Sequence, residues 1–429
     1  MMKNRLSLSA LRKEALAGFT TFLTMAYIIF VNPSILSTPG TGLPYSGVLA
    51  ATVLLCFLMT LLMGLYADLP FAVAPGMGIN AFFTYTLILG KGIPWPIALG
   101  MVFWSGLLFV LISLSPLRVL IAKAIPLQLR TASAVGIGLF LTFIGLKNSG
   151  LIVAHPVTFV TFGKLGPQSL LCLLGLFVII YFMKKKKPYA FLVGILFITL
   201  ISMLLGYSRL PPQIFSKPDF SSVFMKLNFL DALKLSFLPA IVAIFFTDLF
   251  DSISTFIGVS QACNLLDKDG EAKNLKEGLL VDAFATMFAG LFGTSAGTAY
   301  IESAAGIQAG GRSGASSVVT ALCFLPFFFI APIAGIVPPY ATAPVLILVG
   351  FLTFESIGKL TFQKIEDAIP AFLTVVLIPL TFSITQGIIW GFISYIICYV
   401  IAGRSKEIKP MMYIISAISL MLLYFENKT

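Results

Sequence analysis

The chain has little charge. Asp, Glu, Lys and Arg make up 10% of its 429 residues, and it holds one histidine and three tryptophans. Its five cysteines show neither the pairing expected of a disulfide framework nor the spacing of metal ligands. We therefore expect no metal or other cofactor. So low a charged fraction is also untypical of a soluble globular protein.

Apolar residues dominate instead: they make up 58% of the chain, and the mean hydropathy is +1.01. A transmembrane helix needs roughly 20 mostly apolar residues, and such windows recur almost from end to end. The sequence therefore predicts an all-α membrane protein of about fourteen spans. We place them at residues 15–37, 46–66, 69–88, 94–114, 130–147, 168–183, 188–206, 235–258, 278–293, 298–309, 315–335, 340–357, 366–384 and 385–402. The apolar tail 410–425 either crosses the membrane or lies at its surface.

The distribution of basic residues predicts the orientation of these spans. With the N-terminus in the cytoplasm, most Lys and Arg residues, including the run Lys184 to Lys187, fall in cytoplasmic segments, as is typical of membrane proteins. We expect a multi-pass protein of the cell (inner) membrane whose lysine run faces anionic lipid headgroups. The net charge of +11 then follows from topology, and no nucleic-acid partner is expected.

Fourteen spans divide into two sets of seven, and an odd number in each set inverts the second set relative to the first. The third and tenth spans, FAVAPGMGINAFFTY and GTSAGTAYIESAAGIQAGG, are the most interrupted by glycine and small residues. Each is expected to begin as a short extended segment and to continue as a half-helix, which requires protein or a wet cavity around its backbone. The two breaks point to one shared central site, with close helix packing as the alternative reason for the glycines.

The inverted repeat predicts how the chain is divided. Residues 1–206 form the first repeat, 207–233 an outer connecting segment, 234–403 the second repeat and 404–429 a C-terminal segment. The third and tenth spans then occupy the same position, three of seven, in their repeats. No soluble domain fits between the spans.

The eighth predicted span carries two aspartates three residues apart, in the stretch AIFFTDLFDSISTF. On a helix, Thr247, Asp248, Asp251, Ser254 and Thr255 share one face, which must turn away from lipid. Burying one aspartate at mid-membrane costs about 2.5–3.5 kcal/mol on insertion scales. An acid in such a place is by default a functional residue, usually for ion or proton handling.

The acids of the predicted spans differ in depth. Asp248, Asp251 and Glu302 are deep, and among them Asp251 and Glu302 are the predicted functional pair, with Asp248 as structural or indirect support. Asp282 and Glu355 are expected near the cytoplasmic ends of their spans, in a solvated or helix-capping role. His155, in an outer loop, is expected at the surface and outside the proton path.

Four motifs together resemble one family. TDLFDSISTFIGV in the eighth span, AYIESAAGIQAGGRSG in the tenth, GMGINAFFTY in the third and TTFLTMAYIIFVNPSIL in the first look like the adenine/hypoxanthine/guanine (AzgA-like) permease branch of the nucleobase:cation symporter-2 superfamily. The resemblance covers essentially the whole chain. It implies a core domain of spans 1–4 and 8–11, a gate domain of spans 5–7 and 12–14, and a purine nucleobase bound between the third and tenth half-helices, against the eighth span.

The resemblance also assigns residues by position. Asp251 matches the base-binding acid of the eighth span, and Glu302 matches the acid at the start of the tenth half-helix. Gly78 and Asn80 match the binding motif of the third span. We expect the substrate-binding set to be Asp251, Glu302, Asn80, Gly78, Tyr300, Ile301, Thr24 and Phe82, and the proton-coupling set to be Asp251, Glu302 and Asp248.

The chain departs from the family pattern at a few positions. Ser254 stands where members of the branch often have glycine, which leaves the preferred base open. Thr255 stands where uracil- and urate-type relatives carry an ionisable residue, and the Gln-Asn pattern of the xanthine/urate branch is absent after Tyr300. Both features favour the purine branch.

The residues by themselves point the same way. A neutral nucleobase offers ring N–H donors to buried carboxylates, while the Asn80 amide and half-helix N–H groups meet its acceptors. Phe82, Phe83 and Tyr300 are candidates for stacking on the ring. Because membrane potential alone cannot concentrate a neutral solute, we predict proton symport through the acid pair, with sodium as the alternative coupling ion.

Other functions fit the sequence less well. An intramembrane aspartyl protease would carry a Gly-x-Gly-Asp motif and fewer spans. A sulfate- or bicarbonate-type anion transporter, or a uracil or xanthine permease on the same fold, remains the alternative, although two acids in one cavity repel an anion. No enzymatic activity is predicted, and the sequence leaves a homodimer open.

Overall fold

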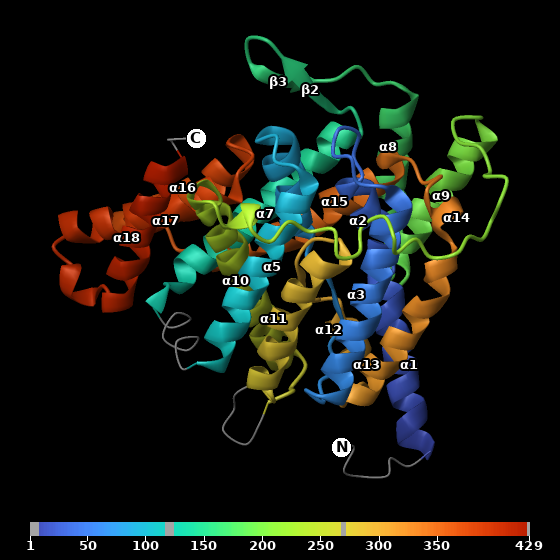
Figure 1. Cartoon of the computed structure of the whole chain (residues 1–429), viewed down its shortest axis with the longest axis horizontal. Coiled ribbons are helices and arrows are strands. Elements are labelled where there is room, and N and C mark those ends of the chain that lie inside the picture. Colours follow the sequence, from blue (N-terminus) through green and yellow to red (C-terminus); the bar gives the residue numbers. More distant parts are fainter. Residues whose placement is uncertain (1–7, 116–123, 267–271, 427–429) are drawn as a thin grey trace.

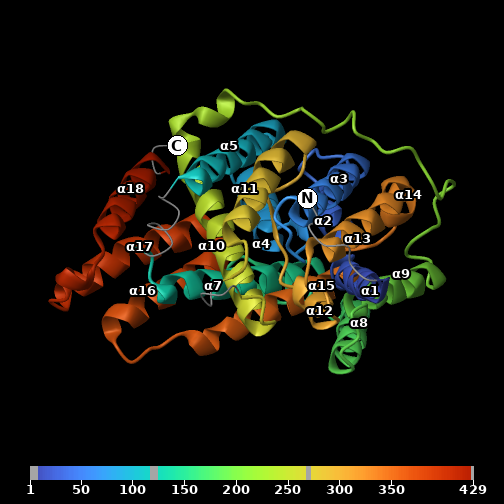
Figure 2. The same cartoon turned by 90° about the horizontal axis from the view of Figure 1, so that it is seen from below.

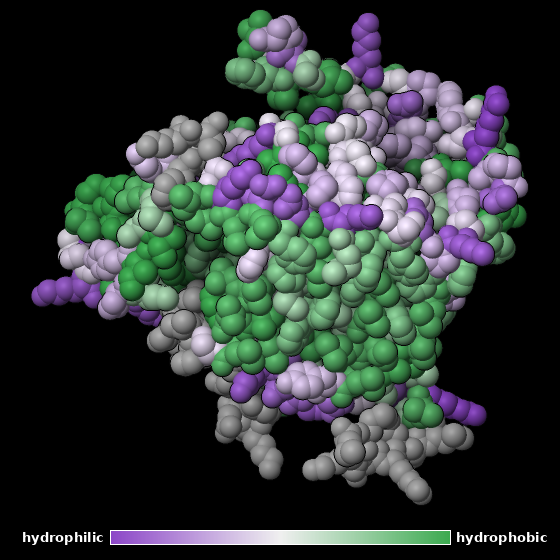
Figure 3. Space-filling model, viewed as in Figure 1, coloured by the Kyte–Doolittle hydropathy of each residue, from purple (hydrophilic) through white to green (hydrophobic). Residues whose placement is uncertain are grey.

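The computed structural model describes residues 8–115, 124–266 and 272–426, and it is mostly helical. Some basic residues predicted to lie in cytoplasmic segments are outside these ranges, namely Lys3, Arg5, Arg118, Lys123 and Lys268. In the described part, eight helices are long and apolar enough to cross a membrane, and shorter apolar helices complete other spans. Figure 3 shows the resulting surface, with an apolar band between more polar ends.

The first half of the chain follows the predicted order of spans, with two differences. The first span is broken at Tyr27, and the third ends in a π-helix, η1. In order, the elements are α1 (Leu8–Met25), α2 (Ile28–Leu36), α3 (Tyr45–Leu65), β1 (Val73–Pro75), α4 (Met77–Ala81), η1 (Phe82–Gly90), α5 (Trp95–Leu114), α7 (Leu127–Asn148), β2 (Ile152–His155), β3 (Phe159–Phe162), α8 (Pro167–Lys184) and α9 (Ala190–Leu204).

The second half repeats the plan, because its third span is again a strand followed by a short helix. Its elements are η2 (Asp231–Leu233), η3 (Leu235–Phe237), α10 (Leu238–Ala262), α11 (Leu275–Phe292), β4 (Gly297–Ala299), α12 (Ser303–Gln308), α13 (Gly314–Phe324), η4 (Leu325–Phe329), α14 (Ala331–Ala334), α15 (Pro339–Phe354), η5 (Glu355–Lys359), α16 (Ile365–Leu380), α17 (Ile384–Ile401), η6 (Ser405–Glu407) and α18 (Pro410–Glu426). The predicted breaks in the third and tenth spans are confirmed.

Contacts between helices fall into two groups (Figure 2). The core group packs α1–α5 with α10–α14, and the gate group packs α7–α9 with α15–α17. Helix α10 lies at the boundary, because it contacts α5 and α11 of the core group and α7 and α17 of the gate group. The tail helix α18 packs on α17 and α10. The residue boundaries of the two repeats remain a prediction.

A hairpin stands where the sequence predicted only an outer loop. Strands β2 and β3 pair antiparallel and project from the end of the molecule opposite the start of α1 (Figure 1). His155 lies at its turn, where the imidazole Nδ1 accepts the N–H groups of Val157 and Thr158. The histidine thus stabilises the turn of the hairpin.

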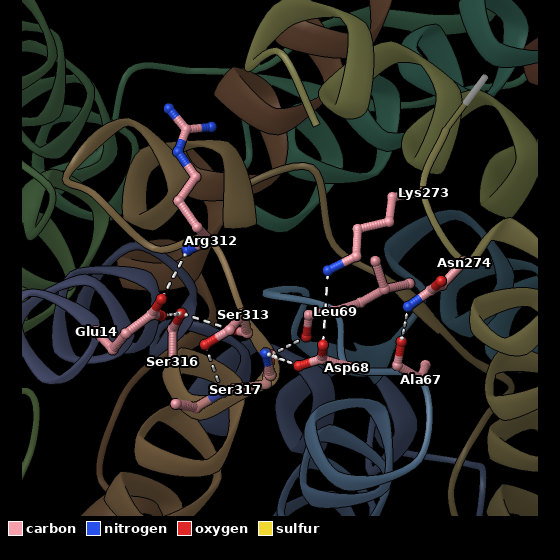
Figure 4. Close-up of polar contacts among 12 residues, drawn as sticks. Glu14, Ala67, Asp68, Leu69, Lys273, Asn274, Arg312, Ser313, Ser316 and Ser317 are labelled. Carbon is pink, nitrogen blue, oxygen red and sulfur yellow. Dashed lines mark hydrogen bonds and ion pairs between the residues drawn. The ribbon is translucent and has the colours of Figure 1, made fainter. Parts of the chain in front are cut away.

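Polar contacts tie the core group together near the start of α1 (Figure 4). Glu14 of α1 accepts the Arg312 N–H at 3.1 Å and the Ser316 hydroxyl at 2.6 Å. Asp68, which follows α3, pairs with Lys273 before α11 at 3.5 Å. Segments far apart in the sequence are therefore held in one arrangement. The buried Glu14 contributes more than the exposed Asp68–Lys273 pair, because solvent screens the latter.

Candidate functional site

Two short strands pair inside the core group. Strand β1 of the third span and β4 of the tenth run antiparallel, with Val73 opposite Ala299, and all their residues are buried. The Tyr300 N–H extends the ladder to the Ala72 carbonyl at 2.9 Å. The backbone N–H and C=O groups at each break thereby gain hydrogen-bond partners that a broken helix cannot supply. Each strand then leads into a short helix, α4 or α12.

The two aspartates of α10 have different surroundings. Asp248 is fully buried: the Thr286 hydroxyl of α11 donates to its Oδ2, and among the described residues its Oδ1 has no hydrogen-bond partner. Asp251, one turn later, is exposed. One turn of helix therefore separates an enclosed acid from an accessible one.

Asp282 belongs to the enclosed cluster, so the prediction of a solvated or capping role was wrong. Helix α11 begins at Leu275, before the predicted start at residue 278, and Asp282 lies well inside it, 0% exposed. The Ser252 hydroxyl of α10 donates to Asp282 Oδ2, and the structure gives Oδ1 no partner in its described part. The charge of Asp282 interacts with those of Asp248 and Asp251.

Glu302 directly precedes α12, which contacts α10, and it lies within range of the charge of Asp251. The predicted pair therefore comes together from the eighth and tenth spans. Tyr27, at the break between α1 and α2, donates its hydroxyl to Glu302 Oε1 at 2.6 Å. The Thr24 hydroxyl, one turn earlier, is 3.4 Å from the Glu302 carbonyl oxygen. The first span thus contacts both the side chain and the backbone of Glu302.

The predicted contacts from the third span lie in different places. Gly78 is half-buried and faces the gate group, since a Cβ there would lie 2.4 Å from Ile137 Cγ2 of α7. Asn80 is fully buried, and its Nδ2 donates to Asn32 Oδ1 at 3.1 Å. Phe82 is 2% exposed within η1. Asn80 and Phe82 are thus not part of the accessible surface around Asp251.

Tyr300 and Ile301 also differ in exposure: the first is buried and the second is exposed. The Tyr300 hydroxyl donates to the Pro75 carbonyl at 2.5 Å, across the strand pair, and the side chain is buried. Ile301 is 63% exposed. The first of the two residues braces the strands, while the second borders the accessible side together with Glu302.

An accessible stripe runs along α10 from Asp251 to the end of the helix. Asp251, Ser254, Gly258 and Gln261 are exposed at intervals of three and four residues, so they share one face. Residues 238–250 are buried or half-buried. Because acidic and polar side chains avoid lipid, we interpret this face as one wall of a wet cavity open toward the C-terminal end of α10.

One set of polar contacts between the two groups lies next to the hairpin. The Thr86 hydroxyl of η1 donates to the Phe382 carbonyl between α16 and α17. Asn148 at the end of α7 donates from Nδ2 to the Tyr85 hydroxyl at 3.3 Å. Lys147 Nζ lies 5.2 Å from the centre of the Tyr85 ring. These contacts join the third span to the gate group where the stripe on α10 is closed.

A model of the family described as "Permease family" (Xan_ur_permease) matches residues 12–389 of the chain. The chain belongs to this nucleobase:cation symporter-2 family. The permease is 39% identical to adenine permease AdeP of Escherichia coli (strain K12) over 415 residues, which cover 96% of this chain and 93% of the relative. It is also 39% identical to guanine/hypoxanthine permease PbuG of Bacillus subtilis (strain 168), with 96% of each chain covered.

The fold of this permease resembles that of a solved transporter. The transmembrane domain of the cyanobacterial bicarbonate transporter BicA matches with a TM-score of 0.65, covering 91% of this chain and 100% of that chain. At 18% sequence identity the likeness shows the fold alone, a seven-plus-seven inverted repeat. The predictions of a multi-pass membrane permease and of no enzyme are confirmed.

Sequence reasoning missed one residue beside the candidate site and gave another the wrong role. Tyr27 stands within the first-span motif, but no periodicity marked the helix break that brings it to Glu302. Asp282 was recognised as an acid in an apolar run, but it was expected near the end of its span because the span was started too late.

Proposed function

We propose that this permease imports purine nucleobases, namely adenine, hypoxanthine or guanine, in symport with protons. One observation carries the proposal: Asp251 and Glu302, from different spans, lie near each other where α10 becomes accessible. Relatives named adenine permease and guanine/hypoxanthine permease, aligned over nearly the whole chain, support a purine substrate.

Hydrogen bonding explains how such a site holds an uncharged ring. The carboxylates of Asp251 and Glu302 accept ring N–H groups, and charge assistance makes these bonds roughly twice as strong as neutral ones. Exposed Ile301 and half-buried Gly78 border the base, and Thr24 supports Glu302. The buried members of the proposed set shape the wall from behind, namely Asn80, Tyr300 and Phe82.

The same acids couple transport to protons. Two carboxylates close together do not both keep their charges easily, so in our proposal the pair shares a proton and titrates as a unit. Asp248 supports the pair from the enclosed cluster, where Thr286 donates to it. Proton uptake with the base neutralises the loaded site and lowers the cost of moving it through the membrane.

Movement of the core group against the gate group completes the cycle. In our proposal the N-terminus is cytoplasmic and the protein lies in the inner membrane, so the cavity along α10 opens inward. The contacts of Thr86 and Asn148 then close the outer side. Release of these contacts, with closure of the stripe on α10, exposes the acids outward.

Labelled-base uptake tests the proposal in cells that lack their own purine permeases. We expect saturable uptake of labelled adenine, hypoxanthine or guanine that an uncoupler abolishes and that replacing sodium by choline leaves unchanged. Loss of uptake in choline would instead assign coupling to sodium. Uptake of labelled bicarbonate or sulfate in place of purines would overturn the proposal in favour of an anion transporter.

Variants of the acid pair test the site. Asp251→Asn and Glu302→Gln each remove a charge-assisted bond, and we expect uptake to fall roughly 10- to 100-fold while the protein still reaches the membrane. Glu355→Gln, at an exposed acid of η5, is the matched control and should transport like the wild type. Normal uptake by both site variants would remove the pair from the site.

A further inference from the structure

We propose that Tyr27 is a positioning residue that holds one oxygen of Glu302 and sets the pH range of transport. The inference rests on the proposed function, in which Glu302 binds the base and shares the proton. It adds to the site a second residue of the first span, after Thr24, and the first whose side chain binds the Glu302 carboxylate.

The break in the first span brings Tyr27 into position. Helix α1 ends at Met25 and α2 begins at Ile28, so Tyr27 lies between two helices. Its side chain is 1% exposed, and its hydroxyl donates to Glu302 Oε1 at 2.6 Å, a distance typical of a bond to an ionised carboxylate. With Oε1 occupied, Glu302 offers Oε2 to a ring N–H of the base.

The other charged and titratable groups around Glu302 do not take the place of Tyr27. Asp251 from α10 carries a like charge, and Tyr300 of the same segment donates its hydroxyl to Pro75 instead. Arg312, the basic residue closest in sequence, donates from Nη1 to the Cys263 carbonyl at 2.5 Å. Within the described residues, the side-chain donor to the Glu302 carboxylate is therefore a neutral hydroxyl.

A neutral hydroxyl favours the ionised carboxylate without cancelling its charge. Glu302 therefore keeps its acceptor character toward the base and can still take up a proton. Without the hydroxyl, an ionised Glu302 beside Asp251 loses a donor and takes up a proton more readily. The pH above which uptake falls should then move upward.

The ring of Tyr27 links this carboxylate to the gate group. It packs edge-on against Phe191 of α9, with 5.1 Å between ring centroids and an interplanar angle of 62°. Movement of the gate group past the core group changes what Tyr27 packs against. The orientation of Glu302 is thereby tied to the position of the gate group.

Tyr27→Phe tests the hydroxyl and keeps the ring. We expect the alkaline limb of purine uptake to move up by about one pH unit, because the ionised form of Glu302 loses the hydrogen bond that stabilises it. Tyr45→Phe is the matched control: its hydroxyl donates to the Ala334 carbonyl at 2.9 Å, between α3 and α14, and its profile should equal that of the wild type. Phe191→Leu, which removes the ring contact, should change the maximal rate without moving the profile.

Infrared titration of the purified proteins separates this inference from the proposed function. The carboxyl band lost in Glu302→Gln identifies Glu302, and its midpoint should move upward in Tyr27→Phe but not in Tyr45→Phe, whether or not purines are transported. No purine uptake by the wild type would defeat the proposed function alone. An unchanged infrared midpoint in Tyr27→Phe would overturn the positioning role.

Discussion

At the scale of single residues, the site holds two kinds of acid. Asp251 and Glu302 meet where α10 is accessible, whereas Asp248 and Asp282 are fully enclosed and each is held by one hydroxyl. Each enclosed acid also has one oxygen without a partner among the described residues. Because a buried carboxylate oxygen without a hydrogen bond is costly, we propose that these acids are kept for a role in transport and not for stability.

Asp282→Asn tests whether the enclosed acids take part in transport. The amide keeps an acceptor for the Ser252 hydroxyl and removes the charge, so the fold and the melting temperature should be preserved. We expect uptake to fall at least about tenfold, equivalent to roughly 1.4 kcal/mol of barrier. Ser252→Ala serves as the comparison and should have a smaller effect. Wild-type uptake by Asp282→Asn would leave Asp282 a packing residue.

The residues of the site could be predicted in part. An acid in an apolar run is visible in the sequence, so Asp248, Asp251 and Glu302 could be named, and in the structure each lies within range of another's charge. Their roles stay a prediction. Which acid is enclosed depends on where a helix begins, and Asp282 was misplaced for that reason. The role of Tyr27 depends on a helix break and a contact 275 positions along the chain, which local patterns do not encode.

At the scale of elements, the third span packs tightly against the gate group at Gly78. A methyl group there would lie 2.4 Å from Ile137 Cγ2, so the Ile137 side chain of α7 packs against the bare backbone of α4. The small residue predicted for substrate binding thus also decides how near the two groups come. Both roles require that no side chain be present.

Gly78→Ala should therefore impair transport through packing. We expect a strain of about 1–3 kcal/mol and a corresponding loss of uptake, because the Ile137 methyl group cannot easily move aside. Adding Ile137→Ala removes that methyl group and should restore much of the uptake. If the double variant stays as inactive as Gly78→Ala, the glycine is needed for contact with the substrate and not for packing against α7.

Elements were predictable where the signal was local. Runs of about 20 apolar residues gave spans that agree with the observed helices, and clustered glycines marked the two breaks. The π-helix η1 and the hairpin of β2 and β3 were not predicted. Their hydrogen-bond register depends on neighbours, and the outer segment lacks the alternation that marks a strand.

At the scale of the whole molecule, the basic residues predict which end of the protein faces the cytoplasm, and therefore to which side the accessible face of α10 opens. The lysine run at 184–187 follows α8 and the hairpin precedes it, so the two should face opposite sides of the membrane. This orientation decides whether the accessible acids face the cytoplasm.

Cysteine labelling tests the orientation. Val157→Cys in the exposed hairpin should react with a membrane-impermeant maleimide in intact cells, whereas Lys185→Cys should react only after the cells are opened. The wild-type chain is the control, because its five cysteines are free and buried or half-buried. The reverse pattern would place the N-terminus outside and turn the cavity outward.

The pairing of β1 with β4 also bears on how the protein is made. Strand β1 leaves the ribosome more than 200 residues before its partner, so the nascent third span enters the bilayer with unsatisfied amide groups. Until the tenth span arrives, water, lipid headgroups or the insertion machinery must shield those groups. Biogenesis of this permease therefore includes a late joining step, and a chain that ended before residue 297 would leave β1 without its partner strand.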